Sequence, residues 1–167
     1  MSEFARILVA AIGAVLVQPM FFIAWMLVSG LLAGKPLDLV DELSWILVVS
    51  VMVAGVFVFS FGIPVFAVLR NLGRLSCTSL GFAGFLLPGL PMAVLVWPSG
   101  GAGHSRSGTW FGNPVPLVVD GALTVYAWLS YAQAVVVAGL HGALGALVFL
   151  WIWRRVGGDM SRAGRTG

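Results

Sequence analysis

Residues Leu129–Trp153 read LSYAQAVVVAGLHGALGALVFLWIW, a stretch without a single Asp, Glu, Lys or Arg. At about 1.5 Å per residue, a helix of this length covers the hydrocarbon core of a bilayer, which is about 30 Å thick. A surface helix of a soluble protein needs a polar face, and this stretch has none. It is therefore predicted to be a transmembrane helix.

Three more apolar runs without charged residues precede it, at about 7–33, 43–69 and 75–97. Of the 167 residues, 60% are hydrophobic and 9% are charged, whereas a soluble domain carries about 25% charged residues. We therefore predict an all-α polytopic membrane protein. Residues 1–156 form a single four-transmembrane-helix bundle, with one long outer loop at 98–128 and a disordered cytoplasmic tail at 157–167.

The charged residues predict the orientation, because Lys and Arg collect on the cytoplasmic side of membrane proteins. With both termini inside, only Lys35 and Arg106 lie outside. The other basic residues all fall inside: Arg6, Arg70, Arg74, Arg154, Arg155, Arg162 and Arg165. The first outer loop, residues 34–42, is acidic. The sequence thus predicts an N-in/C-in protein of the cell inner (cytoplasmic) membrane.

The outer loop at 98–128 has two parts of different composition. It begins with a Gly/Ser-rich stretch, which is predicted to be mobile. Residues 109–119 are aromatic and spaced by prolines, so we expect them to lie along the outer interface or to cover the mouth of the bundle. From Asp120 the chain forms either a short interfacial helix or an early start of the fourth span, with Leu123 and Tyr131 as alternative first residues.

Prolines in three of the spans predict irregular helices, because proline removes a helical hydrogen-bond donor. Pro19 is expected to kink the first span, and the segment 61–64 to bend the second. Two prolines and a glycine at 88–91 predict a broken or widened segment in the third. At the start of that span, Ser76, Thr78 and Ser79 offer oxygens for an N-cap.

Small residues on the fourth span predict a surface for close helix packing, since association in lipid depends on close packing of backbones. They recur at intervals of four residues: Ala134, Ala138, Gly142 and Ala146. Packing within the chain is the favoured interpretation, and a dimer interface is the alternative.

Three polar residues are predicted to lie at the same depth, near the middle of the bilayer. Gln18 and His141 each lie about 18 Å along their helices from the expected cytoplasmic edge, and Ser60 lies at nearly that level. We hypothesise that Gln18, Ser60 and His141 converge, since a histidine in hydrocarbon usually faces the bundle interior with a partner. The alternative is that His141 bonds one nearby hydroxyl or backbone carbonyl and has a structural role only.

Several function classes find no support in the residues. The net charge of +3 is not arranged as a basic stripe with aromatics, so no nucleic-acid partner is expected. No catalytic constellation and no cofactor motif is present, and His104 has no second metal ligand at a suitable spacing. The four-helix layout resembles that of quinone-linked disulfide oxidases, but those need paired cysteines and this chain has only Cys77. No family is assigned, and the protein is expected not to be an enzyme.

Two functions remain open. The first is a small bacterial inner-membrane protein that acts as a non-enzymatic accessory subunit or as a protective, immunity-type protein. It would bind another membrane protein, or further copies of itself, through its helices and through outer-loop residues such as Trp110, Phe111 and Tyr126. The alternative is a small transporter or channel-like protein with the polar cluster as its site. A bacterial origin is suggested by the preference for Arg over Lys together with much Gly, Ala and Val.

Overall fold

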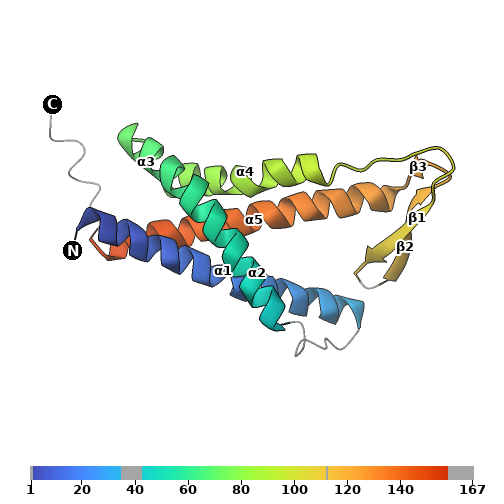
Figure 1. Ribbon diagram of the computed structural model, residues 1–167, viewed down its shortest axis with the longest axis horizontal. Coiled ribbons are helices and arrows are strands. Elements are labelled where there is room, and N and C mark those ends of the chain that lie inside the picture. Colours follow the sequence, from blue (N-terminus) through green and yellow to red (C-terminus); the bar gives the residue numbers. More distant parts are fainter. Residues whose placement is uncertain (1, 35–42, 112, 158–167) are drawn as a thin grey trace.

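The computed structural model describes residues 2–34, 43–111 and 113–157 (Figure 1). Its elements are, in order, α1 (Glu3–Ala33), α2 (Leu43–Phe57), a π-helical segment η1 (Val58–Gly62), α3 (Ile63–Asn71), α4 (Cys77–Leu95), β1 (Arg106–Trp110), β2 (Asn113–Val119), β3 (Ala122–Leu123) and α5 (Val125–Arg155). Four helical spans, with α2, η1 and α3 forming one of them, are long and apolar enough to cross a membrane. This confirms the predicted number of spans and is consistent with a multi-pass membrane protein. The predicted tail lies outside the described residues beyond Gly157, as does almost all of the predicted acidic loop.

The segment between α4 and α5 contains a small β-sheet, which differs from the all-α expectation. Its three antiparallel strands follow the order β1-β2-β3. A two-residue turn at Asp120 and Gly121, with φ of 50° and 85°, joins β2 to β3. Asp-Gly favours such a turn, because both positions require a positive φ. The fourth span then begins at Val125, close to the earlier of the two predicted starts.

Helices α4 and α5 pack closely along their length through small residues (Figure 1). A Cβ atom added to Gly84 would lie 2.6 Å from Ala146 Cβ and 2.7 Å from the Gly142 carbonyl oxygen. A Cβ atom on Gly142 would in turn lie 2.6 Å from Cγ of Pro88. Since real Cβ atoms do not approach other atoms this closely, glycine is required at both positions.

The prolines inside α1 and α4 do not interrupt these helices. Helix α1 continues through Pro19, and α4 continues through Pro88 and Pro91, so the expected break at 88–91 is wrong. In a membrane protein, neighbouring helices can compensate for a missing donor, and Pro88 lies directly against α5. An irregularity does occur at the predicted place before Pro64. There the Ile63 N–H donates to the Val58 carbonyl and closes the wider π-type turn.

The start of α4 is capped as the sequence predicted. The Ser76 hydroxyl accepts from the Ser79 N–H at 3.0 Å, and the Ser79 hydroxyl accepts from the Ser76 N–H at 3.0 Å. This reciprocal pair is a capping box, which satisfies backbone donors that the helix leaves free. It defines Cys77 as the first residue of the helix.

The buried apolar cluster lies at the end of the molecule that holds both termini of the described chain. Phe66 of α3 contacts Phe149 and Trp153 of α5, with ring centroids 4.8 Å and 5.2 Å apart. The buried cluster is completed by residues of α1, α4 and α5 and by Leu75 just before α4: Ala10, Ala11, Ala14, Leu75, Leu80 and Leu150. Toward the opposite end, α1 and α2 diverge from the α4–α5 pair (Figure 1).

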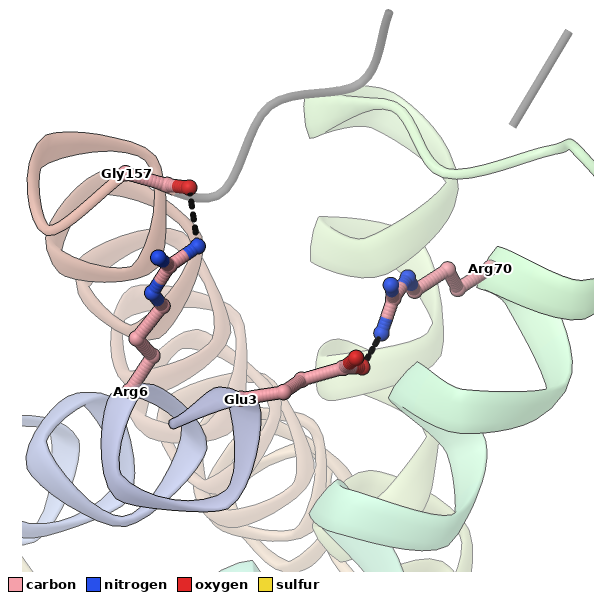
Figure 2. A network of polar contacts seen from close by, with 4 residues as sticks. All are labelled: Glu3, Arg6, Arg70 and Gly157. Atoms are coloured by element: carbon pink, nitrogen blue, oxygen red, sulfur yellow. Dashed lines mark hydrogen bonds and ion pairs between the residues drawn. The ribbon is translucent and has the colours of Figure 1, made fainter. Parts of the chain in front are cut away.

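Polar contacts join the same end (Figure 2). Glu3 at the start of α1 forms an ion pair with Arg70 at the end of α3. Arg6 donates to the carbonyl oxygen of Gly157, just after α5. The Arg70 guanidinium also lies 5.6 Å from the centre of the Trp153 ring. These contacts hold α1, α3 and α5 together where the apolar core is densest.

We expect Gly142→Ala to lower the thermal stability of the purified protein strongly, because the new methyl group would collide with backbone atoms of α4. Overpacking of this kind costs about 1–3 kcal/mol. The matched control is Gly55→Ala, since a Cβ atom there has no neighbour within 4 Å. Thermal unfolding in detergent would compare the two. A Gly142→Ala protein as stable as the Gly55→Ala control would contradict the close α4–α5 contact.

Candidate functional site

An open cleft of about 820 Å³ lies between α2 and the other spans. Its lining on α5 runs from Ser130 to Phe149, a length of about 28 Å along the helix. This length is close to the thickness of the hydrocarbon core of a bilayer, about 30 Å. Most of its lining is apolar, and the polar side chains in it are few: Gln18, Ser50, Thr109, Ser130, Gln133 and His141.

The cleft exists because the second span has no close neighbour on this side. In the most apolar 18-residue stretch of this span, no residue is buried inside the protein. Helix α2 contacts α1, and the closest packing in the molecule is between α4 and α5 instead. Apolar side chains such as Trp45 and Val53 therefore remain exposed. In a membrane these surfaces face either lipid or another protein.

The predicted small-residue face of α5 forms one wall of this cleft. All four of its members line it: Ala134, Ala138, Gly142 and Ala146. Two of them, Gly142 and Ala146, also approach Gly84 of α4. The C-terminal half of this face thus packs against α4, and the whole face borders the cleft.

Gln18 and His141 are brought together on opposite sides of the α1–α5 contact. The Gln18 side chain is 8% exposed and donates through Nε2 to the backbone carbonyl of His141 at 3.0 Å. A Cβ atom on Gly145 would collide with this Nε2 atom. Glycine at 145 therefore leaves the space that the Gln18 amide occupies, and the amide bonds α1 to α5.

The His141 ring is held by its own helix and by aromatic neighbours. Its Nδ1 lies 2.8 Å from the Val137 carbonyl oxygen, which can only accept, so Nδ1 carries the proton. The ring meets Phe21 edge to face, with centroids 4.3 Å apart. Nε2 is buried and has no hydrogen-bond partner among the described residues. This geometry favours the structural interpretation of His141, in which the ring bonds a nearby backbone carbonyl.

Ser60 does not join the other two members of the hypothesised cluster. It lies in η1, its side chain is exposed, and it is not part of the cleft lining. The prediction for Ser60 rested on depth along the helix, and depth leaves the direction of the side chain open. The divergence of α2 from α5 and the extra residue of the π-type turn decide that direction here.

The three aromatic residues expected at the outer loop lie on two elements. Trp110 and Phe111 stand at the β1–β2 turn, with ring centroids 5.1 Å apart in an edge-to-face arrangement. Phe111 has a φ of 44°, a left-handed conformation that is unfavourable for an aromatic residue. Tyr126 lies in the first turn of α5. The strained turn places two large aromatic rings at the tip of the hairpin.

The sequence reasoning missed several polar residues of the cleft. Gln133 is one of them, and it lines the cleft with His141. Their spacing of eight residues, with Val137 between them, places them on one face of a helix, so periodicity could have revealed it. Ser50 donates to the carbonyl of Ile46 in its own helix. Thr109 comes from β1, and no sequence signal places that strand at the cleft.

Comparisons with known proteins give no relative: no protein-family model, no curated protein and no solved structure matches the chain. Within residues 2–34, 43–111 and 113–157, no group of three or more His, Cys, Asp and Glu side chains could hold a metal ion. The candidate site is therefore defined by its shape and its apolar lining.

We expect Gln18→Met to weaken the α1–α5 contact while keeping the volume of the side chain. Interhelical hydrogen bonds in membranes are worth about 0.6 kcal/mol on average, so the thermal midpoint should fall slightly but measurably. His141→Phe is the companion variant, because it keeps the ring contact with Phe21 and removes both ring nitrogens. Its midpoint should fall between those of the wild type and His141→Ala, because it keeps the ring contact with Phe21 but loses the bond from Nδ1 to the Val137 carbonyl. A His141→Phe midpoint as low as that of His141→Ala would contradict a contribution from the ring contact.

Proposed function

We propose that this chain is a small bacterial inner-membrane protein that acts as a non-enzymatic accessory subunit or as a protective, immunity-type protein. It would act through helix–helix contacts in the membrane and through the hairpin outside it. The observation that carries the proposal is the apolar cleft beside α2. The most apolar 18-residue stretch of the second span holds no buried residue, and together with the neighbouring cleft it leaves a large apolar surface for another transmembrane helix.

The wall formed by α5 supports helix binding rather than binding of a polar solute. Small side chains let a neighbouring backbone approach closely, which is the main source of helix association in lipid. Ala134 and Ala138 lie in the half of this wall away from the α4 contact at Gly84. This half is thus available for an approaching helix.

The hairpin supports a second contact outside the membrane. A residue held in a left-handed conformation costs about 1–3 kcal/mol and is typical of functional sites. Phe111 occupies such a conformation while its ring and that of Trp110 stand at the turn. Aromatic rings are common energetic centres of protein interfaces. The tip formed by Trp110 and Phe111 is the proposed outer contact, and Tyr126 at the start of α5 extends it.

The orientation with both termini in the cytoplasm belongs to the same proposal. At the end with the apolar core, the described residues carry Arg6, Arg70, Arg74, Arg154 and Arg155. At the sheet end, the described residues carry one arginine, Arg106, and no lysine. Positive residues favour the cytoplasmic side, so the sheet would face the outside.

The alternative, a small transporter or channel-like protein, rests on Gln18 and His141 in the cleft wall. A polar solute would need a continuous row of available polar groups across the membrane. The Gln18 amide nitrogen and the His141 Nδ1 are both bonded to backbone carbonyls, and the lining around them is apolar. The accessory or protective function is therefore the better supported of the two.

The test is purification of the tagged full-length chain from its native membrane in a gentle detergent, followed by mass spectrometry and sizing. We expect one membrane protein to be retained in a fixed ratio. The Ala138→Leu protein should no longer retain this partner, because a leucine side chain would fill the cleft. The matched control is Ala132→Leu, on the exposed side of the same helix. The Ala132→Leu protein should still retain the partner.

Recovery of the chain alone, as a monomer or as a homo-oligomer, would contradict the accessory or protective function. Equal retention by Ala138→Leu and Ala132→Leu would place the contact away from the cleft. Thermal unfolding of both variants checks that they are folded.

A further inference from the structure

A second, smaller recess lies at the opposite end of the α4–α5 pair from the sheet. It has a volume of about 240 Å³ and lies between the first residue of α4 and the last two turns of α5. Its lining combines an apolar floor with two guanidinium groups: Cys77, Leu147, Leu150, Trp151, Arg154 and Arg155. Because it lies at the ends of two membrane spans, its mouth is level with the lipid headgroups.

The two arginines of this recess have no carboxylate partner among the described residues. Of the other arginines at this end, Arg70 pairs with Glu3 and Arg6 donates to the Gly157 carbonyl, while Arg74, outside the recess, also has no carboxylate partner among the described residues. Arg154 donates to the Cys77 sulfur at 3.4 Å, and a thiol sulfur is a weak acceptor. The Arg155 guanidinium lies 5.3 Å from the centre of the Trp151 ring. Both groups therefore retain most of their capacity to donate to an anion.

The apolar part of the recess continues from the arginines toward the membrane interior. Leu147 and Trp151 are 41% and 60% exposed. Leu147 lies seven residues before Arg154, about 10 Å deeper along the helix. Leu150 closes the floor and is 1% exposed. A ligand that fills the recess thus needs a negative charge at one end and an apolar chain at the other.

We propose that this recess binds an anionic phospholipid. The phosphate group is held between Arg154 and Arg155, and an acyl chain lies along Leu147 and Trp151. Guanidinium groups suit this role, because their planar array of donors matches the oxygens of a phosphate. Trp151 fits the same position, since tryptophan favours the membrane interface. Free phosphate would use only the charged half of the recess, so the apolar half identifies the lipid as the ligand.

The experiment uses the full-length protein in detergent micelles with added phosphatidylglycerol or phosphatidylcholine, each brominated on its acyl chain. Bromine quenches tryptophan fluorescence at close range, and Trp151 lies in the recess. We expect phosphatidylglycerol to quench at lower concentration than phosphatidylcholine. Each arginine near a membrane surface contributes about a fivefold change in affinity for anionic lipid. Arg155→Gln should therefore weaken binding about fivefold, and Arg154→Gln with Arg155→Gln should remove the preference.

Two controls separate this site from general attraction to a basic surface. Arg74→Gln removes one positive charge from the same end, outside the recess, and should keep the preference. Trp151→Phe should lose the part of the quenching that is specific to phosphatidylglycerol. Glycerol phosphate, which lacks the acyl chains, should not compete at concentrations where phosphatidylglycerol saturates.

Three results would overturn the proposal. The first is equal quenching by the two lipids. The second is the same loss of affinity in Arg74→Gln as in Arg155→Gln, which would show attraction to the whole basic end. The third is effective competition by glycerol phosphate, which would identify an anion site without a lipid chain. None of these results depends on whether the protein has a membrane partner.

Discussion

The contact between α4 and α5 at Gly84 and Gly142 is the feature on which the rest of the architecture depends. In lipid, apolar side chains gain little by leaving their surroundings, so helices associate where their backbones can come close. A Cβ atom at Gly84 would lie within 2.7 Å of the Gly142 carbonyl oxygen, which shows how close that approach is. This contact keeps α4 continuous through its prolines and makes α5 a fixed wall. The first two spans are arranged around that wall.

The packing is uneven from one end of the molecule to the other, and this unevenness creates the candidate sites. At the basic end, Phe66, Phe149 and Trp153 form an aromatic core, and the Glu3–Arg70 pair closes it (Figure 2). Away from this end, α2 leaves α5 and the apolar cleft opens. The Gln18 amide stabilises the α1–α5 contact at intermediate depth. One end of the protein is thus held together by its own contacts, and the other end exposes apolar surface that no part of the described chain covers.

The sequence predicted the four spans well, because the hydrocarbon core imposes a length and a composition on each of them. It did not predict the sheet, since proline-spaced residues such as Pro114 and Pro116 weaken a strand signal. Asp120-Gly121 was interpreted as the start of a helix, although this dipeptide favours a hairpin turn. The prolines of α4 were expected to break the helix because the compensating contact with α5 is a tertiary effect. Local sequence does not show it.

The candidate site was predicted only in part, for a geometric reason. Equal depth correctly grouped Gln18 with His141, yet it also grouped them with Ser60, which faces away from the cleft. Depth follows from counting residues, whereas the direction of a side chain depends on how each helix is rotated and tilted against its neighbours. The small-residue face of α5 was predicted as a packing surface. Its position beside an open cleft follows from the divergence of α2, which no pattern within one helix can indicate.

The most direct test of this account is photo-crosslinking from the cleft in intact native membranes. A photoreactive amino acid would replace Val53 of α2, which lines the cleft, and separately Leu90 of α4, which is exposed outside it. The account predicts one discrete adduct with a second membrane protein from Val53 and none from Leu90. Adducts with lipid alone, or with another copy of this chain, from Val53 would contradict it.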